Sequence, residues 1–251
     1  MNTNLVQSAL ATHQHMSRSD RYGFVPTTDL IEKMGQHGWQ VVSASEARCR
    51  DRSRVGFNKH LLRFRNPSLP AVTDAVPELL LLNSHDGSST YQMRAGFYRF
   101  VCMNGLVVGE DIFPTFRVRH GKDALKDVIE GTYEIMDRVP EIVGQIGDMR
   151  AISLTDGERL AFARAALPLR FGHSPITEEQ ALQTHRNADN GHDLWSTFNV
   201  VQENLIKGGQ RGHDAQGRRR RTRAVNGIDG NVKLNSALWT LAEEMRKLKA
   251  A

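Results

Sequence analysis

The hydrophobic pattern of the chain is strand-like in its first half. The predicted strands cover residues 39–42, 60–65, 78–84, 90–103, 106–108 and 113–119. Asp86-Gly87 and Asn104-Gly105 lie between such stretches, and both dipeptides favour the tight turns of β-hairpins. The pattern therefore predicts an antiparallel β-meander over residues 39–119.

From residue 123 onward, apolar residues recur every three or four positions, as they do on one face of a helix. The predicted helices cover residues 28–36, 123–149, 155–167, 193–207 and 235–249, with a short one from Thr177. Pro140 is expected to kink or split the longest of them. Thr155-x-x-Glu158 and Thr177-x-x-Gln180 have the form of capping boxes. Strands followed by helices predict an α+β fold, with an N-terminal antiparallel β-meander followed by several helices packed on one face.

This pattern predicts one folded domain with a flexible start. We expect residues 1–25 to be a flexible segment and residues 26–251 to be a single α+β domain, β-rich over 39–119 and helical over 123–249. Residues 207–223 are rich in Gly, Gln and Arg and are expected to form a basic mobile loop. The composition, 39% hydrophobic and 24% charged, is that of a globular protein.

Two features bear on cellular location. The longest apolar run is four leucines, residues 79–82, which is far shorter than a membrane span, and no apolar leader precedes the first elements. Cys49 and Cys102 have no zinc-type or redox-motif spacing, so we expect them to be reduced thiols. These features predict a cytoplasmic protein without a membrane partner.

Positive charge is concentrated in two segments. Residues 48–65 and residues 207–223 each contain seven Lys/Arg and one Asp, a net charge of +6 apiece. The chain as a whole carries +5, so the remainder carries −7. Clustered positive charge on an otherwise acidic chain favours a polyanion partner, although solvated charge that only aids solubility is the alternative.

The first basic segment has a period of two. Arg48, Arg50, Arg52 and Arg54 would point to the same side of a strand, which predicts a hairpin over residues 48–65 with one Arg-rich face and one apolar face. Like charges on one face are costly unless an anion neutralises them. The alternative is an Arg-rich loop without fixed geometry.

The residue patterns of common enzymes are missing from the sequence. It contains no P-loop, dinucleotide-binding, nucleophile-elbow or zinc-protease motif. Ser84-His85-Asp86 has the residue types of a catalytic triad, but adjacent residues cannot adopt that geometry and a turn explains them. Asp86, Glu110 and Asp111 could hold Mg²⁺ in a nuclease, which we keep as a third alternative. We expect no cofactor and no resident metal.

The chain also resembles a known family. The matching residues are 62–64, 77–79, 83–89, 96–108 and 194–204, and the strings N-S-H-D-G-S-S and N-G-L-V-V-G are the specific ones. They resemble the phage/plasmid-like proteins of domain of unknown function 932. The resemblance covers roughly residues 20–249 and implies a mobile-element protein without an assigned activity. It also suggests an analogy to single-strand annealing proteins, which use a basic groove, need no ATP and form rings or filaments.

These observations predict a protein that binds and anneals single-stranded DNA, independently of sequence and of ATP, and assembles into homo-oligomers. The residues expected to hold phosphates are Arg48, Arg50, Arg52, Arg54, Lys59, Arg63, Arg65, Arg117, Arg119, Arg218, Arg219, Arg220, Arg221 and Arg223. The candidates for stacking on bases are Trp39, Phe57, Tyr91 and Tyr98, and the alternative for each of them is a place in the core. The alternative from a different class is an anti-defence protein that binds and inhibits a host CRISPR-type or nuclease complex.

Overall fold

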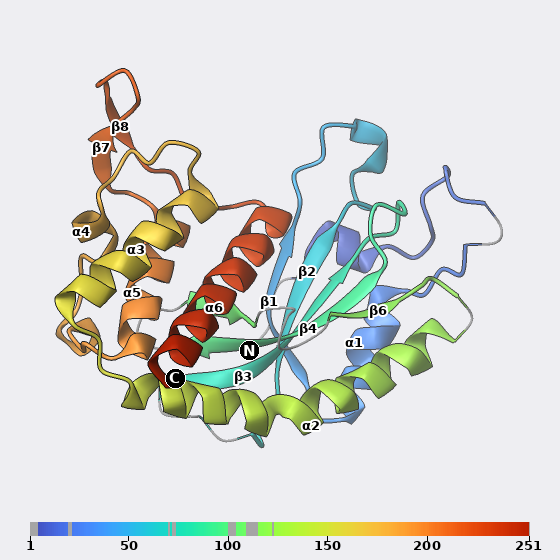
Figure 1. The fold of residues 1–251 in the computed structure, drawn as a ribbon. Coiled ribbons are helices and arrows are strands. Elements are labelled where there is room, and N and C mark those ends of the chain that lie inside the picture. Colours follow the sequence, from blue (N-terminus) through green and yellow to red (C-terminus); the bar gives the residue numbers. More distant parts are fainter. Residues whose placement is uncertain are drawn as a thin grey trace. The chain divides into compact units, whose positions relative to one another are not determined.

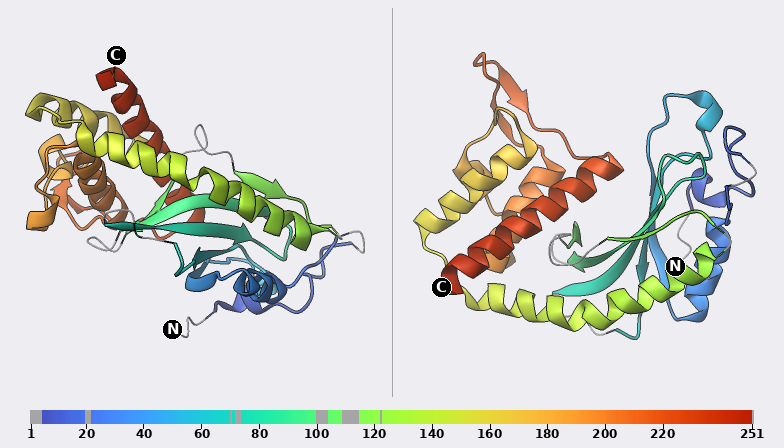
Figure 2. Two further views of the ribbon diagram at one scale, coloured as in Figure 1. Left: turned by 90° about the horizontal axis from the view of Figure 1, so that it is seen from below. Right: turned by 45° about the vertical axis from the view of Figure 1, so that its right-hand side comes forward.

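The computed structural model of the chain describes residues 5–19, 22–69, 71, 74–99, 104–108, 115–121 and 123–250. The chain divides into two compact units (Figures 1 and 2). Unit 1 comprises Met1–Phe100 and Phe113–Val139, and unit 2 comprises Val101–Ile112 and Pro140–Ala251. The α+β class is confirmed, since strands dominate the first half and helices the second. A single domain over residues 26–251 stays a prediction.

Unit 1 is built on an antiparallel sheet. Its strands are β1 (Gln40–Glu46), β2 (His60–Arg65), β3 (Ala75–Asn83), β4 (Tyr91–Arg99) and β6 (Phe116–Val118). Strands β1 to β4 are adjacent in chain order, as in a meander, and β6 pairs with β4. All nine residues of β3 are buried, because the leucine run is covered on both faces of the central strand.

The predicted Arg-rich hairpin is wrong in its first arm. Strand β2 pairs with β1 and β3, and residues 47–59 form a long connection that contains the short 3-10 helix Arg52–Arg54. Asp51 begins this turn by accepting a hydrogen bond from the Ser53 backbone N–H at 3.0 Å. The period of two in the arginines therefore reflects a structured loop and not a strand face.

Two helices contribute to the core of unit 1. Helix α1 (Thr27–Gln36) buries Leu30 and Met34. Helix α2 (Ala124–Ala151) places Thr132 against the sheet, with its hydroxyl 3.5 Å from the sulfur of Met34 and 3.8 Å from that of Met93 on β4. Pro140 lies inside α2 without splitting it, at the boundary between the two units.

The N-terminal segment makes defined contacts with unit 1 over its described residues. A 3-10 helix, Gln7–Leu10, buries Ser8 and Ala9, and Ser8 donates through its backbone N–H and its hydroxyl to Glu46 of β1. Nε2 of His15 lies 3.1 Å from the Ser53 carbonyl oxygen. These contacts attach the described part of the segment to unit 1, and its flexibility stays a prediction.

Unit 2 is mainly helical. Its elements are β5 (Asn104–Val107), α3 (Asp156–Arg170), α4 (Glu178–Ala181), α5 (Leu194–Lys207), β7 (Arg211–His213), β8 (Arg219–Arg221) and α6 (Ile228–Ala250). Both predicted capping boxes are present, at Thr155 and Thr177. Trp195, Phe198 and Trp239 form a buried aromatic cluster between α5 and α6, with ring centroids 5.7 to 6.3 Å apart.

In the described part of the chain, none of the helices has the length and apolarity that a membrane span requires.

Candidate functional site

The second basic segment forms a hairpin instead of the predicted mobile loop. Arg211 lies opposite Arg221, Gly212 opposite Arg220, and His213 opposite Arg219. Figures 1 and 2 show this hairpin projecting from the helices of unit 2. It displays most of the arginines of the segment on one ordered element.

The hairpin closes through a short Asp-Gly turn. The backbone N–H of Asp214 donates to the Arg218 carbonyl at 3.0 Å, and that of Gly217 donates to the Asp214 carbonyl at 2.9 Å. Gly217 has a φ of +73°, a conformation that favours glycine in three-residue hairpin loops. The turn thereby fixes the register that places the arginines opposite one another.

Asp214 is the acidic residue of the hairpin. Its carboxylate accepts from the side chains of Arg218 and Arg220, each at 3.0 Å. Burial alone would raise the pKa of Asp214, but hydrogen bonds from these arginines and from the Arg218 and Gln216 backbone lower it below its usual value. One carboxylate thus partly neutralises two of the guanidinium groups.

The other arginines of the hairpin region have no acidic partner within the part of the chain that the structure describes. No carboxylate within the described residues pairs with Arg211, Arg219, Arg221 or Arg223, and all four side chains are exposed. The Arg221 side chain donates through Nε to the Gly209 carbonyl, at 2.8 Å. Because guanidinium groups bind phosphate oxygens strongly, these four residues can hold an anion without breaking an internal ion pair.

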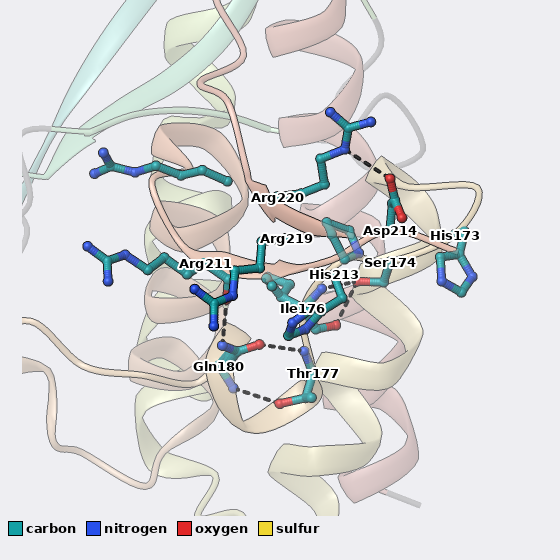
Figure 3. A pocket seen from close by; sticks show the side chains of 13 residues that line it. His173, Ser174, Ile176, Thr177, Gln180, Arg211, His213, Asp214, Arg219 and Arg220 are labelled. Carbon is teal, nitrogen blue, oxygen red and sulfur yellow. Dashed lines mark hydrogen bonds and ion pairs between the residues drawn. The ribbon is translucent and has the colours of Figure 1, made fainter. Parts of the chain in front are cut away.

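A pocket of about 1050 Å³ opens beside the hairpin (Figure 3). It lies between the hairpin strands and residues 173–177, with α4 at one end. The lining residues are His173, Ser174, Pro175, Ile176, Thr177, Gln180, Arg211, Gly212, His213, Asp214, Arg219, Arg220 and Arg221. The pocket therefore combines a positively charged wall with the apolar side chains of Pro175 and Ile176.

Hydrogen bonds attach the hairpin stem to the body of unit 2. The backbone N–H of His213 donates to the Pro175 carbonyl at 2.9 Å, and Gln180 Nε2 donates to the Arg211 carbonyl at 2.9 Å. A Cβ at Gly212 would overlap the Pro175 carbonyl oxygen, so only glycine allows this close approach. The pocket wall is consequently held in place at its base.

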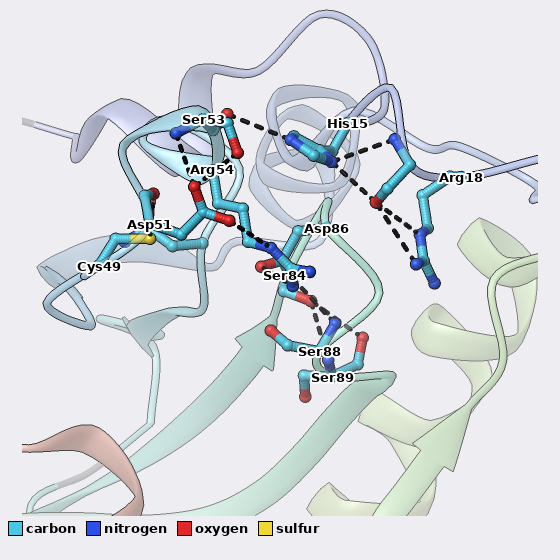
Figure 4. Close-up of polar contacts among 12 residues, drawn as sticks. His15, Arg18, Cys49, Asp51, Ser53, Arg54, Ser84, Asp86, Ser88 and Ser89 are labelled. Carbon is cyan, nitrogen blue, oxygen red and sulfur yellow. Dashed lines mark hydrogen bonds and ion pairs between the residues drawn. The ribbon is translucent and has the colours of Figure 1, made fainter.

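The arginines of unit 1 are divided between solvent and internal partners. Arg48, Arg50 and Arg52 are exposed on the 47–59 connection. Arg54 instead lies 3.4 Å from Asp51 and 3.5 Å from the buried Asp86 (Figure 4). The first three remain available to a ligand, whereas Arg54 joins its loop to the turn after β3.

Arg63 and Arg65 have a structural role that the sequence analysis did not foresee. They donate to the two oxygens of Glu78, at 2.8 and 2.7 Å, and the Glu78 side chain is fully buried. The Arg65 guanidinium also lies over the Tyr98 ring, 4.7 Å from its centroid. Both arginines neutralise a buried carboxylate, so an expected role in phosphate binding conflicts with their observed contacts.

Three other predicted phosphate ligands lie near the sheet of unit 1. Lys59 is half-buried just before β2. Arg117 on β6 and Arg119 directly after it are exposed. Their role in binding stays a prediction.

Two of the four predicted stacking residues are in the core. Trp39 is 5% exposed and Tyr91 is 1% exposed, with the Tyr91 hydroxyl donating to the Val25 carbonyl at 2.7 Å. A role in base stacking is therefore wrong for both residues. Phe57 is half-buried against the rings of His13 and His15, and Tyr98 is half-buried beneath Arg65.

The specific motif at residues 83–89 is buried except for Gly87 and Ser88, which are exposed. Ser84, His85 and Asp86 point to different partners: Ser89, Thr27 and Arg54, respectively. This arrangement is that of a turn, as expected from the sequence, and not of a triad. The motif ties the end of β3 to α1 and to the 47–59 connection.

Thr27 is the centre of a buried polar cluster in unit 1. Its hydroxyl oxygen lies 3.0 Å from Nε2 of both His60 and His85, and it accepts from Asn83 Nδ2 at 3.3 Å. Burial lowers the pKa of His60 to about 4 and that of His85 to about 3, the latter with help from the charges of His60 and His120. Both imidazoles are therefore neutral at pH 7, where they can accept from a hydroxyl or an amide.

The described residues contain no metal site that would support the nuclease alternative. Asp86 accepts a hydrogen bond from the Ser88 backbone N–H at 2.9 Å and lies beside Arg54. Glu110 and Asp111 lie outside the described residues, as does Cys102. No group of three or more His, Cys, Asp or Glu side chains in the described ranges could hold a metal ion.

Several residues of the pocket were missed in the sequence. Arg211, His213 and Asp214 fall in the basic segment, and a period of two on either side of Asp214 and Gly217 was the available signal for a hairpin. His173 and Ile176 carry no comparable signal, because they reach the pocket through tertiary contacts between distant segments.

Comparison with known proteins places the chain in a family. The model of the domain of unknown function DUF932 matches residues 14–239. The UPF0380 proteins YafZ and YfjQ of Escherichia coli (strain K12) are each 45% identical over 243 residues, which is 96% of this chain and 88% of theirs. No solved structure matches the chain. The protein therefore belongs to the family defined by the domain of unknown function DUF932.

Proposed function

We propose that this protein binds single-stranded DNA through its phosphates, without reading sequence and without a nucleotide cofactor. The observation that carries the proposal is the Arg211–Arg221 hairpin: three of its exposed arginines, and Arg223 just after it, have no carboxylate partner among the described residues. Nucleic-acid phosphates supply a dense row of the anions that such arginines bind, with release of counterions.

Charge and rigidity support this proposal. Two cross-strand pairs, Arg211 with Arg221 and His213 with Arg219, place three guanidinium groups and one imidazole on one face. Like charges held in this way repel one another, and the repulsion is relieved when an anion binds. Because the stem is hydrogen-bonded to Pro175 and Gln180, little further ordering is required on binding.

The proposed lack of sequence preference follows from the kind of contact. Arginine contacts to phosphates fix the position of a strand but carry no sequence information. A preference for single strands is supported by the open pocket beside the arginines, because it has room for bases that are not already stacked in a duplex.

Annealing is the activity that we propose for the assembled protein. Two complementary strands must be held close together, so the proposal includes a homo-oligomer, as a ring or filament, in the cytoplasm. The exposed Arg48, Arg50 and Arg52 of unit 1 provide a second positively charged surface that a long strand could contact. Light scattering with and without single-stranded DNA measures the assembly directly.

Fluorescence anisotropy tests the proposed function. Labelled single strands of several sequences and a duplex of equal length are titrated with the full chain at low salt. The proposal expects similar affinity for all single strands and weaker binding to the duplex. Absence of binding to both forms would contradict it and would direct attention to a protein partner, such as a host defence complex.

A further inference from the structure

The pocket beside the hairpin is larger than phosphate binding requires. Its volume of about 1050 Å³ is at the upper end of the range for pockets that enclose small organic ligands, about 300–1,000 Å³. A phosphate group held at the hairpin would fill only part of this space. The rest of the pocket therefore has room for a second part of the ligand, one that the arginines do not bind by charge.

The side chains around this space suit a flat heterocycle. Ile176 is buried and forms an apolar surface together with Pro175. His173 and His213 are both exposed and line the same pocket, and imidazole rings are among the side chains that stack on unpaired bases. Thr177 and Gln180 lie at the α4 end (Figure 3).

The arginines are placed to hold the backbone attached to such a base. Arg219 and Arg221 lie two residues apart on one strand, so they point to the same face and can hold two phosphates of one chain. Arg211 lies opposite Arg221 and adds to the charge on that face. All of them line the pocket that contains the histidines and Ile176.

We infer that this pocket receives an unpaired nucleobase of the bound strand, stacked on His213 or His173 above Ile176, while Arg219 and Arg221 hold the adjoining phosphates. This inference rests on the proposed function and adds a site for the base. The hairpin then binds a strand through two kinds of contact, one ionic and one apolar. A duplex satisfies only the first, because its bases are paired and stacked.

An oligomer that has phosphates but no bases distinguishes the ionic contact from the contact with the base. Oligothymidine and an abasic oligomer with the same number of phosphates are titrated against the wild-type chain and the double variant His173→Ala/His213→Ala. His192→Ala serves as the matched control, because His192 is exposed in unit 2 and outside the pocket. Circular dichroism verifies that each variant is folded.

We expect the wild type to bind oligothymidine at least about tenfold more tightly than the abasic oligomer, a difference of about 1.4 kcal/mol. The double variant should lose this difference, and His192→Ala should keep it. Equal binding of both oligomers by the wild type would overturn the base pocket while the phosphate-binding function stands. A difference that survives in the double variant would also overturn it, and binding of neither oligomer would refute both proposals.

Discussion

Arg211 lies directly opposite Arg221 in the β7–β8 hairpin, so two guanidinium groups share one cross-strand position. Like charges at such a position destabilise a hairpin, and neither arginine has a carboxylate partner among the described residues. The stem is stable because Pro175 and Gln180 hold its backbone. An arrangement that sacrifices some local stability for exposed charge is typical of a binding site.

Removal of charge from the hairpin should weaken binding to all sequences alike. For Arg219→Ala/Arg221→Ala we expect at least about a tenfold rise in Kd, since hydrogen bonds to charged groups contribute about 1.5–3 kcal/mol each. The rise should be the same for every single strand, because phosphates carry no sequence information. Anisotropy on several labelled oligonucleotides measures it.

A variant with the same loss of charge elsewhere is the control for this experiment. Arg138→Ala/Arg150→Ala removes two exposed positive charges from α2. We expect a much smaller effect than that of the hairpin variant. Equal weakening by both variants would show that only net charge matters, and would remove the hairpin from the binding site.

Substitution of Gly212 should displace the hairpin without removing any charge. A Cβ in Gly212→Ala would overlap the Pro175 carbonyl oxygen, so the stem must move away from residues 173–177. We expect weaker binding of single strands and faster amide exchange at His213, whose N–H donates to Pro175. Gly227→Ala is the control, because a Cβ there meets nothing within 4 Å. If Gly212→Ala bound single strands and exchanged the His213 amide like the wild type, the attachment of the hairpin stem to Pro175 would be contradicted.

Loss of the Glu78 charge should destabilise unit 1. In Glu78→Gln, Arg63 and Arg65 lose a fully buried carboxylate partner. We expect the free energy of unfolding to fall by about 3 kcal/mol, the lower end of the range for breaking a buried pair, because both arginines keep some access to water. Urea denaturation measures the change. Glu130→Gln, which breaks the exposed pair with Lys126, should change it by less than about 1 kcal/mol, and similar values for the two variants would refute the assignment.

Stability should fall as the pH drops below about 6.5. Burial lowers the pKa of His60 to about 4 and that of His85 to about 3, so the folded chain keeps both neutral while the unfolded chain takes up protons. Each histidine then removes up to about 1.4 kcal/mol per pH unit from the free energy of unfolding, between pH 6.5 and its folded pKa. Urea denaturation at pH 7 and pH 5.5 tests this, and equal stability at the two values would contradict it.

The sequence predicted those parts of the fold that depend on local signals. The leucine run of residues 79–82 and both capping boxes lie where the pattern placed them. The alternation of arginines over residues 48–54 predicted a strand, but these residues form a loop with a short 3-10 helix. A period of two in the sequence does not by itself distinguish a strand from such a loop. Tertiary contacts of Ser53 and Asp86 decide that case.

Burial and pairing of side chains could not be predicted from the sequence alone. Trp39 and Tyr91 are suitable residues for stacking, but they fill the core, and Arg63 and Arg65 neutralise a glutamate on the neighbouring strand. Conversely, the sequence predicted a mobile loop for the second segment, whereas a turn at Gly217 places its arginines on the paired strands of a hairpin. The count of charged residues identified the basic segment. Only the fold shows which of its arginines are paired with Asp214 and which have no carboxylate partner among the described residues.

The salt dependence of single-strand binding tests most directly whether the hairpin holds phosphates. With Arg211, Arg219, Arg221 and Arg223 engaged, a plot of log binding constant against log salt should have a slope of about −3, from about −0.7 per phosphate contact on single strands. In Arg219→Ala/Arg221→Ala the slope should flatten by about 1.4. A wild-type slope near zero, or one unchanged in the variant, would contradict phosphate binding by this hairpin.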